Sequence, residues 1–246
     1  MLSSAHVGGS LGLTTLCLAA LALSVVPAAA SPEDGSDSPP WPSYLAFPDT
    51  ITPFVYRIYH HSLPYREAHA LGPRALPQLT AMLEKEKYKL HWQTIAATIN
   101  YIGEPSGFPA LQSFMLNKFR GEIDSPTYSA MLAIIATMGP LAATSDSAFA
   151  FLASGTEPEF WSNLPWTNEH HEGRYLRLLL SGLAVNSMAL SGRQEAIPVL
   201  ERLAKTPLDE AQRADIGQGL KTQREVEKVG RERYYDELGR SRGNPW

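Results

Sequence analysis

One short motif recurs along the chain and constrains its fold more than any other feature. It has the form small–apolar–Pro–x–Leu. The copies are residues 75–79, 107–111, 196–200 and, with alanine in place of proline, 148–152. A glycine precedes each copy, at Gly72, Gly103, Gly139 and Gly192. Glycine ends helices in the left-handed conformation, and proline is tolerated in the first turn of the next helix, where its missing N–H has no intrahelical partner. Each copy therefore predicts a boundary between two helices.

Apolar residues between these motifs recur at intervals of three and four, as on one face of an α-helix. Two of the clearest stripes are Trp92, Ile95, Ala96, Ile99 and Ile102, and Tyr175, Leu176, Leu179 and Leu183. A capping hydroxyl stands before a proline at Thr52 and Ser125, which predicts helix starts there. No stretch of comparable length alternates with period two. The sequence therefore predicts an all-α fold with no β-sheet.

The order of glycine, turn and Ala/Pro/Leu motif over about residues 64–230 resembles the HEAT-repeat family, in the short bacterial form also called PBS-lyase-like. The resemblance implies a right-handed α-solenoid of about four stacked helix pairs, with a concave groove. Tetratricopeptide repeats are also helix pairs of similar length. The prolines early in the predicted helices argue against them.

The first thirty residues have the pattern of a secretory signal peptide. They contain no Lys, Arg, Asp or Glu, and an apolar run from Leu11 to Val26 is followed by Pro27 and three alanines. We expect cleavage after Ala30 and a secreted or periplasmic protein. The alternative is an uncleaved anchor, since the run is about long enough to span a membrane. Only in that case is membrane contact expected.

The remaining chain divides by composition. A spacer rich in proline and acidic residues covers 31–51 and precedes a helical-repeat domain at 52–239. Within that domain we expect an N-terminal cap at 52–69, an inserted aromatic loop at 153–170 and a charged C-terminal helix at 207–239. Residues 240–246 are expected to form a loose tail.

Composition and motifs exclude several function classes. A net charge of −4 argues against nucleic-acid binding, which requires clustered Lys and Arg. The one cysteine, Cys17, lies in the signal segment, so a disulfide framework and cysteine chemistry are excluded from the mature chain. No nucleophile elbow, phosphate loop, His-Glu-x-x-His motif or dinucleotide fingerprint is present. We therefore expect no catalytic residues, no cofactor and no enzyme.

Two histidine doublets leave one chemical alternative open. They are His60-His61 and His170-His171, the second flanked by glutamates. Imidazole and carboxylate groups suit zinc or another transition metal. Adjacent residues on a helix point about 100° apart, however, so a doublet rarely chelates through both rings. Exposed loop positions are the simpler interpretation, and a metal- or small-molecule-binding protein or enzyme using these doublets is the alternative.

The inserted loop is the most informative local feature. Phe160, Trp161 and Trp166 stand among prolines in a long segment between helices. Aromatic anchors are enriched at interaction hot spots, and long loops in compact folds are often functional. We interpret these three residues as partner-binding. The alternative is that Phe160 and Trp166 fold back and cover the end of a helix pair.

These observations favour a secreted, non-catalytic scaffold that binds a protein or peptide through the concave face and the aromatic loop. A homodimer in which a second copy fills the groove is a further possibility.

Overall fold

The computed structural model describes residues 49–59, 63–169, 173–206 and 210–241, which belong to one compact unit spanning Ser43–Trp246. The predicted signal peptide and residues 31–48 of the spacer lie outside the described residues. So do residues 60–62, 170–172, 207–209 and 242–246.

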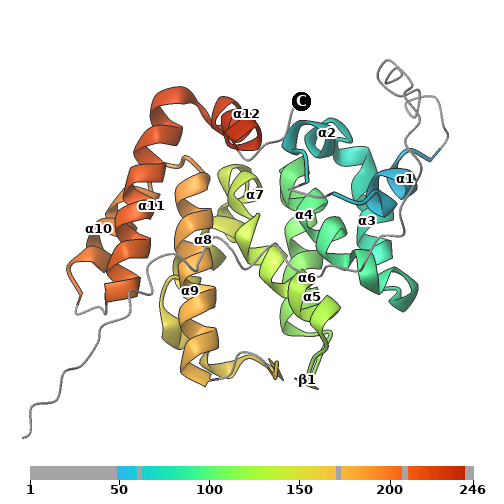
Figure 1. The fold of residues 1–246 in the computed structure, drawn as a ribbon, viewed down its shortest axis with the longest axis horizontal. Helices are drawn as coiled ribbons and strands as arrows, with labels where there is room; N and C mark the ends of the chain where they lie inside the picture. The colour runs from blue at the N-terminus through green and yellow to red at the C-terminus, as the bar shows by residue number, and fades with distance from the viewer. Residues whose placement is uncertain (1–48, 60–62, 170–172, 207–209, 242–246) are drawn as a thin grey trace, which may run out of the picture. The chain divides into compact units, whose positions relative to one another are not determined.

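The described chain is almost entirely helical (Figure 1). Its α-helices are α1 Ile51–Tyr56, α2 Tyr65–Ala70, α3 Leu76–Leu83, α4 Trp92–Ile102, α5 Phe108–Leu116, α6 Ser125–Ala136, α7 Gly139–Thr144, α8 Asp146–Gly155, α9 Gly173–Leu190, α10 Ala196–Ala204, α11 Glu210–Val229 and α12 Arg231–Ser241. Short 3-10 helices are η2 Pro73–Ala75, η3 Glu86–His91, η4 Pro105–Gly107 and η5 Pro158–Asn163.

The all-α prediction is confirmed, but the expectation of no β-sheet is wrong at one place. Strands β1 Gly121–Glu122 and β2 Trp166–Thr167 pair in parallel, with Gly121 opposite Trp166 and Glu122 opposite Thr167. Two residues per strand are too few to produce a period-two pattern in the sequence. The pairing joins two connections that lie 45 residues apart along the chain, so nothing local predicts it.

Consecutive helices pack in pairs. Helix α3 contacts α4, α5 contacts α6, α8 contacts α9, and α10 contacts α11. The second helices of the pairs also contact one another in order, α4 with α6, α6 with α9 and α9 with α11 (Figure 1). Helix α7 lies between α4, α8 and α9. Each pair therefore covers the apolar side of its neighbours, because a single pair cannot bury both of its faces.

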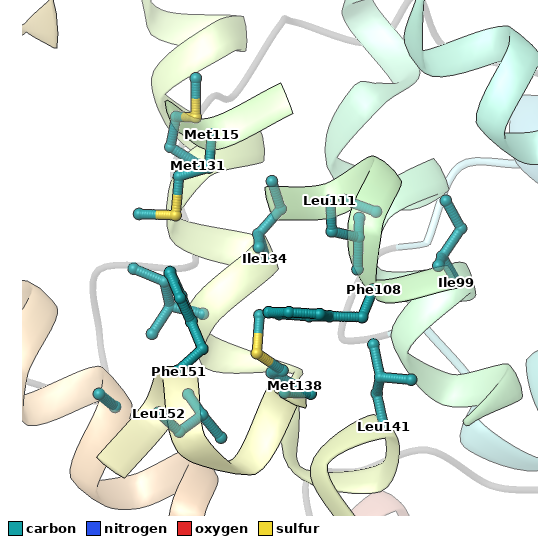
Figure 2. Packing of buried hydrophobic residues seen from close by; sticks show 14 of the residues in the cluster. Ile99, Phe108, Leu111, Met115, Met131, Ile134, Met138, Leu141, Phe151 and Leu152 are labelled. Atoms are coloured by element: carbon teal, nitrogen blue, oxygen red, sulfur yellow. The ribbon is translucent and has the colours of Figure 1, made fainter. Parts of the chain in front are cut away.

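A continuous hydrophobic core fills the space between these helices. Side chains from α4, α5, α6, α7 and α8 converge there, among them Ile99, Phe108, Met131, Leu141 and Leu152 (Figure 2). The predicted stripe of α4 is buried along its whole length. In α9 the predicted stripe is wrong in register. Tyr175 is 55% exposed, and the buried face instead carries Leu176, Leu180, Ala184, Val185 and Met188.

Three of the four motif glycines have the positive φ expected of glycines at helix ends, although the ψ of −179° at Gly72 takes it out of the left-handed helical region. Gly72, Gly103 and Gly192 have φ values of 66°, 72° and 68°. Gly139 differs, because it begins α7. A Cβ on Gly139 would lie 2.8 Å from Leu190 Cβ and 3.0 Å from the carbonyl oxygen of Ser187, both in α9. Gly139 is therefore required for the close approach of α7 to α9 rather than for a turn.

Aspartates cap the helices that the sequence analysis assigned to hydroxyl caps. The Asp124 carboxylate accepts the backbone N–H of Thr127 at 3.2 Å, so it caps α6 in place of Ser125. The Asp49 carboxylate accepts the N–H groups of Ile51 and Thr52, each at 3.1 Å. The capping side chain of α6 is one residue before the predicted Ser125, and that of α1 is three residues before the predicted Thr52. Carboxylates are as effective as hydroxyls in this role.

At each end of the predicted domain, two helices stand where the sequence analysis expects one segment. The expected cap at 52–69 is two short helices, α1 and α2, with Pro64 immediately before α2. Ile58, two residues beyond the end of α1, is 79% exposed. The expected helix over 207–239 is broken by Gly230, which has a φ of 84° and separates α11 from α12.

One stretch among the described residues is long and apolar enough to cross a membrane by length and composition, Ser125–Thr144. It contains two helices, α6 and α7, and 67% of its apolar window is buried within the protein. Helices that form the centre of a hydrophobic core have the same high hydropathy, and α6 and α7 are mostly buried in this way.

Replacing Gly139 with alanine is expected to destabilise the protein. The added methyl group has no room against α9, and overpacking of this kind typically costs about 1–3 kcal/mol. Gly217→Ala in α11 is the matched control. No atom lies within 4 Å of its added Cβ, so higher helix propensity should stabilise the protein by up to about 1 kcal/mol. Urea unfolding followed by circular dichroism measures both, and the same sign for the two variants would contradict the packing argument.

Stability is expected to fall in acid partly through Asp124. Burial alone would raise the pKa of this carboxyl, but hydrogen bonds from Lys89 and Thr127 outweigh burial and lower the pKa. The Lys89 ammonium lies 2.7 Å from the carboxylate. A lowered pKa in the folded state gives stability that is present above the unfolded-state pKa of about 3.9 and lost as the pH falls through the folded value.

The Asp124→Asn variant keeps a side-chain cap but cannot titrate. Its stability should therefore decline less than that of the wild type between about pH 5 and pH 2. Parallel pH-dependent urea unfolding of the two proteins measures the difference. Identical pH profiles would show that Asp124 has the same pKa folded and unfolded.

Candidate functional site

The inserted loop is held to the connection between α5 and α6. Beyond the β1–β2 pairing, the Gly121 N–H donates to the carbonyl oxygen of Pro165 and the Ile123 N–H donates to that of Thr167, each at 2.9 Å. Its first residues complete α8, and residues 158–163 form η5. The loop therefore has a fixed backbone over most of its length.

Trp161 and Trp166 lie in the core, at 2% and 1% exposure. The Trp161 indole N–H donates to the carbonyl oxygen of Gly155 at 2.7 Å, and the Trp166 indole N–H donates to that of Met115 at 2.8 Å. Buried indoles with satisfied N–H groups are anchors of the fold. In the folded protein little of either ring is accessible to a partner, which argues against the interpretation of Trp161 and Trp166 as partner-binding residues. For Trp166 the alternative, folding back onto the helices, is what the structure describes.

The absence of a side chain at Gly155 makes this burial possible. A Cβ at Gly155 would lie 2.6 Å from Cζ2 of Trp161. The last residue of α8 thus provides the space in which the indole ring packs.

Phe160 is the one predicted partner-binding residue that reaches the surface. It is 40% exposed, and its inner side packs edge-on against Trp161 and Phe151, with ring centroids 4.8 and 5.5 Å away. The ring is therefore held in place by two buried aromatic neighbours. An exposed aromatic side chain that is already ordered loses little entropy on binding.

Phe160 borders a hollow of about 390 Å³ between the loop and the end of α5. Its lining residues are Leu116, Arg120, Phe160, Trp161, Asn163, Leu164 and Pro165. The floor is largely apolar. Sequence reasoning missed Leu116 and Arg120, because contacts between distant segments, the β1–β2 pairing and the Trp166–Met115 hydrogen bond, bring the end of α5 to the loop.

Arg120 supplies the positive charge of the hollow. One guanidinium nitrogen, Nη1, donates to the carbonyl oxygens of Leu116 and Phe119 at 3.1 and 3.0 Å. In the described part of the chain no carboxylate pairs with this guanidinium. The group is thus oriented by its own backbone and retains donors for an external acceptor.

The metal alternative falls on positions that are not described. His60, His61, His170 and His171 lie outside the described residues. Within the ranges 49–59, 63–169, 173–206 and 210–241, no three His, Cys, Asp or Glu side chains form a group suited to a metal ion. His69, close to the first doublet in sequence, makes a 3.0 Å hydrogen bond through Nδ1 with the carbonyl oxygen of Tyr101.

Comparisons with protein-family models, with curated protein sequences and with solved structures found no match.

Replacing Trp166 with phenylalanine should lower the free energy of unfolding by about 1–3 kcal/mol, because the buried carbonyl oxygen of Met115 loses its indole donor. Phe160→Leu keeps an apolar side chain at a partly exposed position and should change stability by less than about 0.5 kcal/mol. Chemical denaturation of both variants provides the measurement. A neutral Trp166→Phe variant would contradict a structural role for the indole N–H.

Proposed function

We propose that this chain is an exported, non-catalytic scaffold that binds a protein or peptide partner. Export rests on the signal-peptide pattern of residues 1–30. The scaffold is a right-handed, HEAT-like α-solenoid. The succession of helix pairs supports it, with α4, α6, α9 and α11 in contact in chain order. Solenoids commonly bind extended partners along one face.

The observation that carries the proposal is the Phe160 surface, which we define as Phe160, Leu116, Arg120, Leu164 and Pro165. An exposed aromatic ring on a rigid base stands beside a hollow with an apolar floor. Apolar side chains flanked by a few oriented polar groups are the usual composition of binding pockets and interface centres.

The positive charge of Arg120 indicates which chemical groups the partner presents to the Phe160 surface. The apolar floor accommodates an aliphatic or aromatic side chain, and the Arg120 guanidinium can donate hydrogen bonds to a carboxylate. The expected ligand is therefore a segment with an acidic group next to an apolar residue. An Asp, a Glu or a chain terminus provides such a group.

Selection of random displayed peptides on the chain from Ser31 onward tests this function. We expect enriched peptides to combine an apolar residue with a carboxylate. Phe160→Ser should weaken their binding at least about tenfold, since central aromatic residues often contribute 2 kcal/mol or more. Arg120→Gln should weaken binding of the acidic peptides and leave neutral variants of the same peptides unaffected.

Ile58→Ser serves as the matched control. Ile58 is 79% exposed and lies outside the Phe160 surface, so its replacement removes an apolar side chain that is more accessible than Phe160. Helical circular dichroism verifies that each variant is folded. Equal binding by wild type, Phe160→Ser and Ile58→Ser would exclude the Phe160 surface as the binding site.

A further inference from the structure

Helix α12 turns back from the end of the helix array and packs on α2, near the start of the described chain. It contacts α11, which precedes it, and α2 (Figure 1). Helix α2 in turn packs on α4. A contact between Arg66 of α2 and Asp236 of α12, which are 170 positions apart, thus joins the two ends of the described helix array.

The contact is centred on one aromatic ring. Tyr235 is 7% exposed and stacks on Tyr65 of α2, with ring centroids 4.6 Å apart and an interplanar angle of 15°. Tyr101, near the end of α4, meets it edge-on at 5.9 Å. On another side, Gly139 of α7 leaves room for the phenol: a Cβ there would lie 3.0 Å from the Tyr235 hydroxyl oxygen. Helices α2, α4 and α7 thus surround the ring of Tyr235.

Two polar contacts flank this ring. The positive charge of Arg231, four residues before Tyr235, acts on the Tyr65 phenol and partly offsets the rise in its pKa that burial causes. Asp236, directly after Tyr235, forms an ion pair with Arg66 of α2. The Asp236 side chain is only 14% exposed. The surface therefore recognises a helix with three elements in fixed order, an arginine, a tyrosine four residues later and an acid after the tyrosine.

Helix α12 buries few side chains in its contact with the rest of the protein. Of its side chains that the structure describes, Tyr235 alone is buried. Two buried polar atoms within the contact, the Tyr235 hydroxyl oxygen and Arg231 Nε, have no hydrogen-bond partner among the described residues. Buried polar atoms without partners weaken a contact, because they lose water and gain nothing in exchange. Helix α12 is therefore held mainly through one ring.

The connection to α11 allows α12 to move as a unit. Gly230 is the single residue between the two helices, and its positive φ is accessible to glycine without strain. A change at this residue swings α12 away from α2 and leaves the hydrogen bonds inside both helices intact. Segments with few buried contacts are those that open locally, below the free energy of global unfolding.

We propose that α2, α4 and α7 form a helix-binding surface that α12 occupies as a reversible self-ligand. A partner helix with the same Arg-x-x-x-Tyr-Asp pattern binds this surface when α12 swings out at Gly230. Short connections hold an intramolecular ligand at millimolar effective concentration, so α12 excludes weaker competitors and acts as an autoinhibitory contact. None of its residues belongs to the Phe160 surface, so this proposal stands or falls independently of the proposed function.

A fluorescein-labelled peptide of residues 230–246 tests the proposal on the full chain. In the Tyr235→Ala protein the attached α12 no longer competes, so the peptide should bind at least about tenfold more tightly than to wild type. Tyr234→Ala is the matched control: it is the same substitution on the same helix, at a side chain that is only partly buried. The Tyr234→Ala protein should bind the peptide as weakly as the wild-type protein does. A peptide that itself carries Tyr235→Ala should bind none of the three proteins.

Fluorescence anisotropy measures the binding, and circular dichroism verifies the folding of each protein. Absence of binding to a folded Tyr235→Ala protein would overturn the proposal. Hydrogen exchange on the wild type gives a readout that needs no variant. Once undocked, an eleven-residue helix is marginal in water, so we expect α12 to lose protection at low denaturant while α2 and α9 stay protected. Exchange of α12 only in step with α9 would likewise overturn the proposal.

Discussion

The contact between successive second helices, α4 on α6, α6 on α9 and α9 on α11, is the interaction on which the rest of the described structure depends. The first helices of the pairs, α3, α5, α8 and α10, are only eight to ten residues long. Isolated helices of that length are marginal in water, so each of them requires its longer partner. The stability of the array is therefore a property of neighbouring interfaces more than of any single pair.

The sequence predicts the helix class and most boundaries, because both depend on local chemistry. The stripe of α4 has one apolar face and a terminal glycine, and it folds as expected. Helix α9 is apolar on several sides, with leucines at positions 176, 178, 179 and 180. Periodicity alone does not determine which of them turns inward. Contacts with α6, α8, α11 and η5 together determine the buried face, and these contacts come from distant parts of the chain.

The sequence indicates the region of the candidate site but only some of the residues that form it. An aromatic loop with prolines is visible in the sequence, but the acceptor that buries Trp166, the carbonyl oxygen of Met115, lies 51 residues earlier. A large ring whose N–H finds such an acceptor belongs to the core. Arg120 carries no local signal at all, since contacts between distant segments, among them the pairing of two-residue strands, bring it to the hollow. Tyr235 was equally inconspicuous within a charged helix.

The glycines that allow close packing have a consequence for how this sequence can change over evolution. At Gly155 an added Cβ would meet Trp161 Cζ2 at 2.6 Å, and at Gly107 it would meet Ile99 Cγ2 at 2.7 Å. A larger residue at either position is compatible with the fold only if the opposing side chain becomes smaller at the same time. Homologous chains should therefore show correlated substitutions at positions 155 and 161, and at 107 and 99. Such pairs would mark the inherited spacing between helices even where little other sequence similarity survives.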